Sequence, residues 1–515
     1  MEKRKYNILQ PLLLSVILAI GMLIGYNINF KHSTPLISSI NENSTGKVGR
    51  VEEVIRFIES KYLYKTNQDN LIEKALQSVT SELDPFSLYI PPDKTADINN
   101  KLNGVYTGIG IESYILNDTL YVIRVMEDGP AMKAGIHSLD KIIQVGNYNL
   151  TGDSIDYSKV RKIISSFGSS PFDVVVQDAN NVKKIMTIKT QKLDNKSLKS
   201  FYYSSDSILY TRIEHFSNHT YREFMQILEK NAINDKIKNL IIDVRDNPGG
   251  YLEEVTKILD QLFDRSKLDL VTTVYHDGRK DVIKSSGRNF YAIDKVIVLI
   301  NENSASGSEV LAGVLQDYDR AVIIGKPSFG KGLVQEQFNM GNGGALRLTI
   351  ANYYLPTGRS IQKELDLDTN YVNSLSSHYE KKDTFYSFYE NRPLMSGGGI
   401  YPDYEVNDSL FQNFKSIYYK FDSVLMKIAV NYISQNKDLL KMPLNEFVEN
   451  YKLNFNQIFL NWENNDSLPE NDLKNILFKA KIAYILYGAD AEQRILNQID
   501  PNIEKAFEII KKHQD

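Results

Sequence analysis

Three short segments between residues 246 and 332 contain the residue types that could do chemistry. They are "DNPGG" at 246–250, "SASGSE" at 304–309 and "GKPSFGKG" at 325–332. Each follows a strand-like apolar run, and α/β folds usually place their sites at strand ends. Glycine-rich turns can present backbone N–H groups to an anion, and serine and lysine can serve as nucleophile and base. These segments are therefore the candidate site.

The third segment almost matches a phosphate-binding loop. Gly325, Gly330 and Lys331 fit G-x-x-x-x-G-K-[ST], but Gly332 has no hydroxyl for Mg²⁺. A helix should follow such a loop, whereas "LVQEQF" alternates apolar and polar residues like a strand. The segment thus lacks two features that nucleotide binding requires. A partly buried lysine has a lowered pKa, and its neutral form can act as general base to a serine.

The other two segments each have a purely structural explanation beside the chemical one. Two glycines after a strand form an ordinary turn, or they offer N–H groups to an anion. Ser306 and Glu309 fit an S-x-x-E capping box, in which the serine only caps a helix and the glutamate reaches back. A nucleophile is also reasonable there, because the helix dipole stabilises developing negative charge. His215 and His219 lack a matching aspartate pattern, so a Ser-His pair is not favoured.

Alternating strands and helices must position these segments. Between about 198 and 361, apolar runs typical of strands alternate with stretches of helical spacing. The predicted strands are "ILYTRIEHF", "NLIIDVR", "KVIVLIN" and "AVIIG", and the predicted helices include "YREFMQILEKNA" and "LEEVTKILDQLF". This order predicts a mixed or parallel α/β sheet.

The N-terminus indicates location. Lys3, Arg4 and Lys5 precede an apolar run from Ile8 to Ile28, which is long enough for a bilayer at roughly 20 residues. Basic residues before such a run predict an inside N-terminus and an exported remainder. No A-x-A-like cleavage site follows. We therefore expect an uncleaved signal anchor rather than a cleaved signal peptide or a buried core helix.

Composition narrows the function classes. A net charge of −4 without a long basic run gives no reason to expect a nucleic-acid partner. The absence of cysteine excludes disulfides, thiolate metal sites and a cysteine nucleophile. The seven histidines are scattered without an H-E-x-x-H motif, so no metal site is predicted. We expect no cofactor.

Residues 100–190 form a separate β-rich stretch that resembles a PDZ domain. The resemblance is carried by "TGIGI" at 107–111 and "DGPAMKAGI" at 128–136. It implies a substrate-binding loop that holds a peptide carboxylate and consists of Gly108, Ile109, Gly110 and Ile111. The family usually has Gly-Asp before the next strand, where this chain has Leu139-Asp140, so the turn is expected to differ. The alternative is a β domain that merely packs.

Residues 301–335 resemble the carboxy-terminal processing peptidases, also called tail-specific proteases. Their pattern is S-A-S-[AG]-S-E, then G-x-x-[ST]-[FY]-G-K-G-x-V-Q. The resemblance implies the nucleophile Ser306, the base Lys331, which lies 25 residues later, and the supporting Gln335. It also assigns the oxyanion N–H groups to Gly250, in "RDNPGG", and to Gly307. Ser308 at the same spacing would put the base at a leucine, which cannot serve.

The stretches "ELDPFSLYI", "YYLPTGRSIQ" and "GGGIYPD" also match, so the resemblance covers roughly residues 50–405. It implies an α/β (α+β) multidomain fold: a ClpP/crotonase-like α/β protease core with an inserted PDZ-like β domain and flanking helical segments. The expected parts are a signal anchor (1–30), a linker (31–47), an N-terminal helical segment (48–92), the PDZ-like domain (93–192), the protease core (193–408, with an insertion at 363–399) and a C-terminal helical region (409–515).

The resulting expectation is an extracytoplasmic serine endopeptidase with a Ser-Lys dyad. Its partners would be protein or peptide substrates with free C-termini, held by the PDZ-like domain, and the membrane, through the N-terminal anchor. We expect it at the periplasmic side of the cell envelope, anchored to the inner membrane. The alternatives are a catalytically inactive PDZ scaffold and a nucleotide-binding protein. Substrate identity, homodimer formation and the role of 409–515 stay open.

Overall fold

The computed structural model describes residues 45–152, 155–178, 180–203, 207–234, 237–363, 383–453 and 471–512. The predicted signal anchor, most of the predicted linker and half of the predicted insertion lie outside these residues. The chain forms two compact units, Met1–Glu82 and Leu83–Asp515. The described part of the first unit is two helices, α2 (Thr45–Lys61) and α3 (Gln68–Ser81). No helix within the described ranges is long and apolar enough to cross a bilayer.

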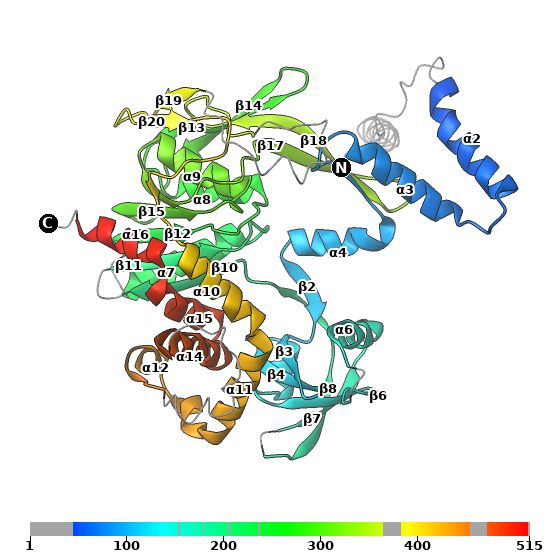
Figure 1. Ribbon diagram of the computed structural model, residues 1–515, viewed down its shortest axis with the longest axis vertical. Helices are drawn as coiled ribbons and strands as arrows, with labels where there is room; N and C mark the ends of the chain where they lie inside the picture. Colours follow the sequence, from blue (N-terminus) through cyan, green and yellow to red (C-terminus); the bar gives the residue numbers. More distant parts are fainter. Residues whose placement is uncertain are drawn as a thin grey trace, which may run out of the picture. The chain divides into compact units, whose positions relative to one another are not determined.

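A six-stranded sheet organises the second unit (Figure 1), in the order β10-β11-β12-β15-β16-β21. The first pair is antiparallel and the other pairs are parallel. Its strands are β10 (Leu198–Tyr203), β11 (Ile208–Ile213), β12 (Asn239–Asp243), β15 (Lys295–Ile300), β16 (Ala321–Gly325) and β21 (Tyr404–Glu405). Because β12, β15 and β16 are parallel neighbours, the segments that follow them start at the same edge.

Both faces of this sheet are covered by helices, which explains why its central strands are continuous apolar runs. One face packs against α7 (Thr220–Asn234), α8 (Leu252–Asp260) and α9 (Gly307–Asp317). The other face packs against α16 (Pro501–Lys511), through Ile503, Ala506, Ile509 and Ile510. The strands and helices predicted between 198 and 361 are confirmed.

A second, antiparallel sheet packs against α8 and α9 and has the order β1-β18-β13-β14, with β17 paired to β18. Its strands are β1 (Leu88–Ile90), β13 (Ser266–Tyr275), β14 (Lys280–Ser286), β17 (Leu333–Asn339) and β18 (Ala345–Tyr354). The segment after Lys331 is thus a strand, as its alternating pattern predicted. A two-stranded hairpin, β19 (Thr384–Tyr386) with β20 (Pro393–Met395), completes this part.

Helix α4 (Pro92–Leu102) leads into a smaller β domain with its own apolar core. A sheet in the order β3-β4-β5-β7-β8, with β6 on β5, is joined by the separate pair β2–β9. The elements are β2 (Val105–Gly108), β3 (Ile111–Leu116), β4 (Thr119–Val125), α5 (Pro130–Ala134), β5 (Lys141–Val145), β6 (Tyr148–Asn149), α6 (Tyr157–Ser166), β7 (Phe172–Gln177), β8 (Lys183–Ile188) and β9 (Gln191–Asp194).

The turn at Leu139-Asp140 shows why a glycine is usual there. Leu139 has φ +71, a conformation that is strained for a residue with a Cβ. Its side chain is buried, 8% exposed, in an apolar cluster with the C-terminal helices. Burial of the leucine side chain compensates for the backbone strain, which is about 1 kcal/mol or more.

The described residues of the C-terminal region are mainly helical, as expected. Its elements are α10 (Ser409–Lys420), α11 (Asp422–Gln435), the 3₁₀ turns η3 (Lys437–Lys441) and η4 (Asn497–Ile499), α12 (Leu444–Asn450), α14 (Asn471–Tyr487), α15 (Ala489–Leu496) and α16. Together these parts confirm the predicted α/β multidomain class.

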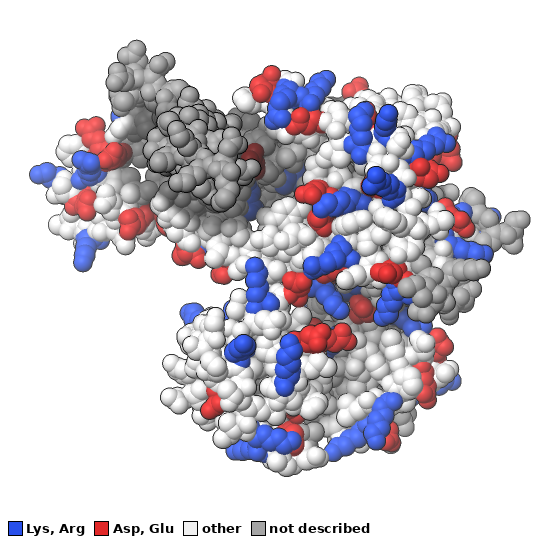
Figure 2. All heavy atoms as spheres, turned by 180° about the vertical axis from the view of Figure 1, so that it is seen from behind, with Lys and Arg blue, Asp and Glu red and all other residues white. Residues whose placement is uncertain are grey.

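On the face shown in Figure 2, positive and negative side chains are interspersed without a large area of one sign.

Candidate active site

Ser306 occupies a sharp turn between β15 and α9. It has φ +54 and ψ −112 and immediately precedes the first residue of the helix. A non-glycine residue with this backbone geometry is strained, and such strain concentrates at functional sites. Every residue of α9 is buried. The N-terminus of this helix therefore directs its partial positive charge toward Ser306 in a water-poor environment.

Glu309 joins the serine turn to the lysine loop. Its fully buried carboxylate accepts four hydrogen bonds. Oε2 accepts from the backbone N–H groups of Ser306 and Lys331, both at 2.8 Å. Oε1 accepts from the Ser328 hydroxyl at 2.6 Å and the Gly330 N–H at 2.7 Å. Three of the four partners are backbone N–H groups, which can only donate and therefore favour the ionised form, whereas burial raises the pKa of this carboxyl.

Tyr353 makes a second connection between the same two residues. This tyrosine lies on β18 and is 2% exposed. Its hydroxyl contacts the carbonyl oxygens of Lys331 and, at 3.2 Å, Ser306. Glu309 and Tyr353 thus hold the backbones of Ser306 and Lys331 from their N–H and C=O sides respectively.

Lys331 lies in a mostly buried environment that disfavours its charge. Burial is the largest cause and Arg347 the next, and together they lower the pKa of Lys331 to about 8, against smaller opposing effects of Glu309 and Asp84. Its Nζ lies 4.5 Å from the centroid of the Phe86 ring. A substantial fraction of this amine is therefore neutral near pH 8.

The two proposed reacting groups are not bonded to each other in this structure. No hydrogen bond joins Ser306 Oγ to Lys331 Nζ, although both residues are fully described. Gln335 is likewise not bonded to Lys331, and its Nε2 donates to the Thr349 hydroxyl at 3.3 Å. The structure therefore brings the backbones of the predicted dyad together and leaves their side chains apart.

The glycine loop after β12 lies directly over the serine turn. A Cβ built on Gly249 would be 2.8 Å from Ser306 Cβ and 2.9 Å from the Gly307 nitrogen. One built on Gly250 would be 2.1 Å from the Phe216 carbonyl oxygen, so neither position tolerates a side chain. Within the described residues the N–H groups of Gly250 and Gly307 donate no hydrogen bond. Two unpaired N–H groups near one serine are what an oxyanion site requires.

The lysine loop is not arranged to hold phosphates. The N–H groups of Gly330 and Lys331 donate to Glu309, and the N–H of Gly332 donates to Gln362 Oε1 at 2.8 Å. A phosphate loop must leave such N–H groups open, and here a carboxylate occupies their position. Together with the strand β17 after the loop, this rules against the nucleotide hypothesis.

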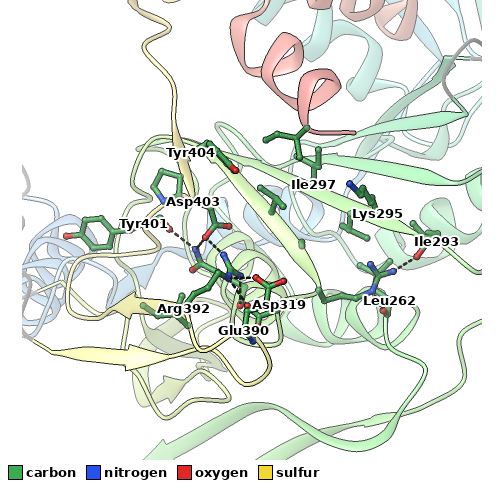
Figure 3. A pocket seen from close by; sticks show the side chains of 18 of the residues that line it. Leu262, Ile293, Lys295, Ile297, Asp319, Glu390, Arg392, Tyr401, Asp403 and Tyr404 are labelled. Atoms are coloured by element: carbon green, nitrogen blue, oxygen red, sulfur yellow. Dashed lines mark hydrogen bonds and ion pairs between the residues drawn. The ribbon is translucent and has the colours of Figure 1, made fainter. Parts of the chain in front are cut away.

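A cavity with a volume of about 1210 Å³ lies elsewhere in the described chain (Figure 3). It is lined by the first residues of β15 and β16, whereas Ser306 follows the last residue of β15. Four of its charged side chains form one cluster of ion pairs centred on Arg392. Arg392 binds Asp319 at 2.7 Å and Asp403 at 2.6 Å. We assign this cavity no part in the chemistry.

Sequence reasoning missed part of the site. Glu309 was recognised only as a helix-capping residue, and Tyr353, Phe86 and Arg347 were not singled out. Tyr353 and Phe86 lie in stretches that match the processing peptidases. This resemblance is the sequence feature from which their place in the site could have been predicted. Among the described residues, no group of three or more His, Asp or Glu side chains is arranged to hold a metal ion.

Residues 207–371 match the model of peptidase family S41. The chain is 32% identical over 345 residues to a carboxy-terminal-processing protease of Bartonella bacilliformis, covering 63% of this chain and 75% of the relative. It is 31% identical over 350 residues to a probable CtpA-like serine protease of Staphylococcus aureus (strain MRSA252), covering 66% and 68%. The solved photosystem II D1 C-terminal processing protease is 22% identical, over 70% of this chain and 93% of that chain, with a TM-score of 0.37.

These relatives define a class, the serine-type peptidases that act on proteins. The chain belongs to peptidase family S41, the family of the carboxy-terminal-processing proteases. The assignment rests on the sequence relatives, because the TM-score of the solved structure is too low to support it.

Proposed function

We propose that this chain is an extracytoplasmic endopeptidase that cleaves proteins at or near their C-terminal tails with a Ser306-Lys331 dyad. The observation that carries the proposal is the shared clamp on the two residues. One carboxylate oxygen of Glu309 binds both of their N–H groups at 2.8 Å, and Tyr353 contacts both of their carbonyls. No purely structural role of the serine turn requires a lysine of lowered pKa at its side.

In the proposed mechanism, Ser306 Oγ attacks the scissile carbonyl while neutral Lys331 takes the hydroxyl proton. Lys331 then gives this proton to the leaving amine, and a water molecule releases the acyl group by the same route. The N–H groups of Gly250 and Gly307 hold the oxyanion. This mechanism requires Lys331 Nζ to move from the Phe86 ring to Ser306 Oγ. It also requires Gln335 to release the Thr349 hydroxyl and form a hydrogen bond with Lys331.

We further propose that the small β domain is PDZ-like and binds the substrate tail. The carbonyls of Ile109 and Gly110 accept hydrogen bonds from Ala131 and Met126, while their N–H groups donate none within the described residues. Gly110 has φ +77, which shapes this loop. The adjacent strand β3 is an edge strand, paired only with β4. A tail strand could therefore pair with β3 while the loop holds its carboxylate.

The outer edge of β3 can be located from one hydrogen bond. The N–H of Ile115 donates to the Tyr157 hydroxyl at 3.0 Å, on the side away from β4. Because backbone groups alternate along a strand, the N–H groups of Ile111 and Ser113 lie on this same edge. These groups are where we place the tail backbone.

Tail binding predicts a requirement for a free carboxylate. A fluorescent tail peptide should bind Ser306→Ala protein, which cannot cut it, at least about tenfold more tightly than the same peptide with an amidated end. The substitution Gly110→Ala should remove this difference, since its Cβ would lie 3.3 Å from the Gly129 Cα in a strained backbone. Gly278→Ala is the control, because Gly278 has φ +82 with nothing within 4 Å. Equal affinity for both peptides would refute carboxylate recognition.

A lysine base predicts a characteristic pH profile. The pKa of Lys331 is lowered to about 8, so kcat/KM should rise about tenfold per pH unit below pH 8 and level off above it. Removing the Arg347 charge, which contributes to the lowering, should shift the profile to higher pH in Arg347→Met. The exposed Arg279→Met is the control. A profile that levels off near pH 6, or fails to move in Arg347→Met, would argue against Lys331 as the base.

Membrane anchoring at the periplasmic side rests on the N-terminal sequence alone. We propose an exported protein held by the apolar run from Ile8 to Ile28, which follows three basic residues. Fractionation of cells that make the full chain should place it in the membrane, and deletion of residues 1–30 should release it.

The competing proposal is an inactive scaffold that only binds tails. The missing bond between Ser306 Oγ and Lys331 Nζ favours it. Cleavage of a loosely folded protein by the wild type but not by Ser306→Ala decides for the peptidase. Tail binding without any cleavage decides for the scaffold.

A further inference from the structure

The C-terminal helical region reaches the glycine loop through buried charges. It lies outside residues 207–371, the part that matches the family model. Nevertheless, two of its side chains contact consecutive residues of the "RDNPGG" motif. Asp500 binds Arg245 Nη1 at 2.8 Å, and Lys415 lies 3.6 Å from Asp246. Arg245, which precedes the glycine loop, thus has a partner about 250 residues later in the sequence.

Arg245 is almost fully buried, at 4% exposed, and its guanidinium is shared between two carboxylates. Nε and Nη2 donate to the two oxygens of Asp243 at 2.9 and 2.6 Å, and Nη1 pairs with Asp500. Asp243 is also fully buried and accepts from the Tyr210 hydroxyl at 2.6 Å. Removing one partner from such a site leaves a buried charge uncompensated, which is strongly unfavourable.

Arg245 and Asp246 have all their oppositely charged partners only when the C-terminal region is counted. Three acidic side chains stand against three basic ones, and each group takes one member from the C-terminal region. The acids are Asp243, Asp246 and Asp500, and the bases are Arg212, Arg245 and Lys415. Without Asp500 and Lys415 the four remaining charges still balance in number, but Arg245 loses its second partner and Asp246 one of its two cations.

Asp246 also sets the direction of the loop. It has φ +61, a strained conformation for aspartate, and its N–H donates to Asn301 Oδ1 at 2.9 Å. The next residue, Asn247, offers its carbonyl to the Ala305 N–H and the Ser308 hydroxyl, both at 3.0 Å. A shift of residues 245 and 246 would therefore move the loop relative to the turn that carries Ser306.

We propose that Asp500, assisted by Lys415, is a positioning residue that holds the Gly249-Gly250 loop over Ser306, so that the C-terminal region is part of the catalytic apparatus. This proposal rests on the proposed function, because the group that Asp500 positions is the Gly250 N–H, to which we assign the oxyanion. Neither side chain touches the reacting atoms. Their effect is transmitted through Arg245 and Asp246.

The test is Asp500→Asn in the full chain. Asp500 also caps α16, because its Oδ1 accepts from the Asn502 N–H at 2.9 Å. Asparagine caps a helix as well as aspartate does, so the substitution removes the charge and keeps the cap. We expect kcat to fall about ten- to hundredfold with KM within about twofold, since oxyanion contacts act in the transition state. A peptide boronate, whose tetrahedral oxygen fills the oxyanion position, should lose affinity by the same factor.

Controls separate positioning from general weakening. Glu508→Gln changes an exposed carboxylate on the same helix and should leave kcat and boronate affinity unchanged. Lys415→Met keeps the side-chain stem and should lower kcat in the same way, by a smaller factor. If Asp500→Asn is unfolded at the assay temperature, Lys415→Met decides. The proposal is overturned if a folded Asp500→Asn protein keeps the wild-type kcat and boronate affinity. If Asp500→Asn does not fold, the same result for Lys415→Met overturns it. Wild type that cleaves nothing would refute the proposed function instead.

Discussion

Ser306→Ala and Lys331→Met are each expected to lower kcat/KM for a loosely folded protein substrate by about 10⁴-fold or more. The first removes the proposed nucleophile, and the second removes the proposed general base. The double variant should be no slower than either single variant, because residues that act as a unit are not additive. Single-turnover cleavage of a labelled protein, followed by gel electrophoresis, measures all three.

The Lys331→Met variant also carries a stability prediction that distinguishes inactivation from unfolding. The pKa of Lys331 in the folded protein, about 8, lies below the ordinary lysine value of 10.5. Below pH 8 the lysine is charged in the folded and the unfolded chain, so the fold bears the full cost of burying that charge. Between about pH 8 and 10.5 only the unfolded chain keeps the proton, and the penalty is relieved as pH rises. Methionine should therefore raise the free energy of unfolding at pH 7 by on the order of 2 kcal/mol. A destabilised or still active Lys331→Met protein would contradict the assignment.

The position of the candidate site follows from patterns that the sequence displays locally. Strands β15 and β16 are continuous apolar runs, and as parallel neighbours they end side by side, with Ile300 opposite Gly325. Whatever follows them must meet at one edge, so Ser306 and Lys331 come together although 25 residues separate them. The glycine loop after β12 joins them for the same reason.

The long-range parts of the site could not be predicted in this way. The capping pattern showed that Glu309 would reach back to Ser306, but not that a loop 20 residues later would bring three more donors to its carboxylate. Asp500 immediately precedes α16, in a region with no motif, and its contact with Arg245 depends on how α16 covers the sheet. Such contacts are set by tertiary packing and leave no periodic signal in the sequence.

Glu309→Gln is the second large effect that we expect, and it acts on fold and catalysis together. Each carboxylate oxygen accepts two hydrogen bonds, so an amide NH₂ placed on either side would face two donors. At about 1 to 3 kcal/mol for each buried group left unsatisfied, the free energy of unfolding should fall by roughly 3 kcal/mol. In protein that remains folded, kcat/KM should fall at least about a hundredfold, because Ser306 and Lys331 lose their common anchor.

Two neighbouring substitutions sharpen this prediction. Glu302→Gln changes an exposed acid four residues before Ser306 and should alter neither unfolding nor activity. Ser328→Ala removes one of the four donors, although its hydroxyl also accepts from the Ile400 N–H, so about 1 to 2 kcal/mol of stability should be lost with activity largely kept. Urea unfolding and kcat/KM of the three variants at one pH provide the comparison. If Glu309→Gln has the unfolding free energy and the cleavage rate of the wild type, the clamp on Ser306 and Lys331 is dispensable. Another interaction must then hold these two residues together.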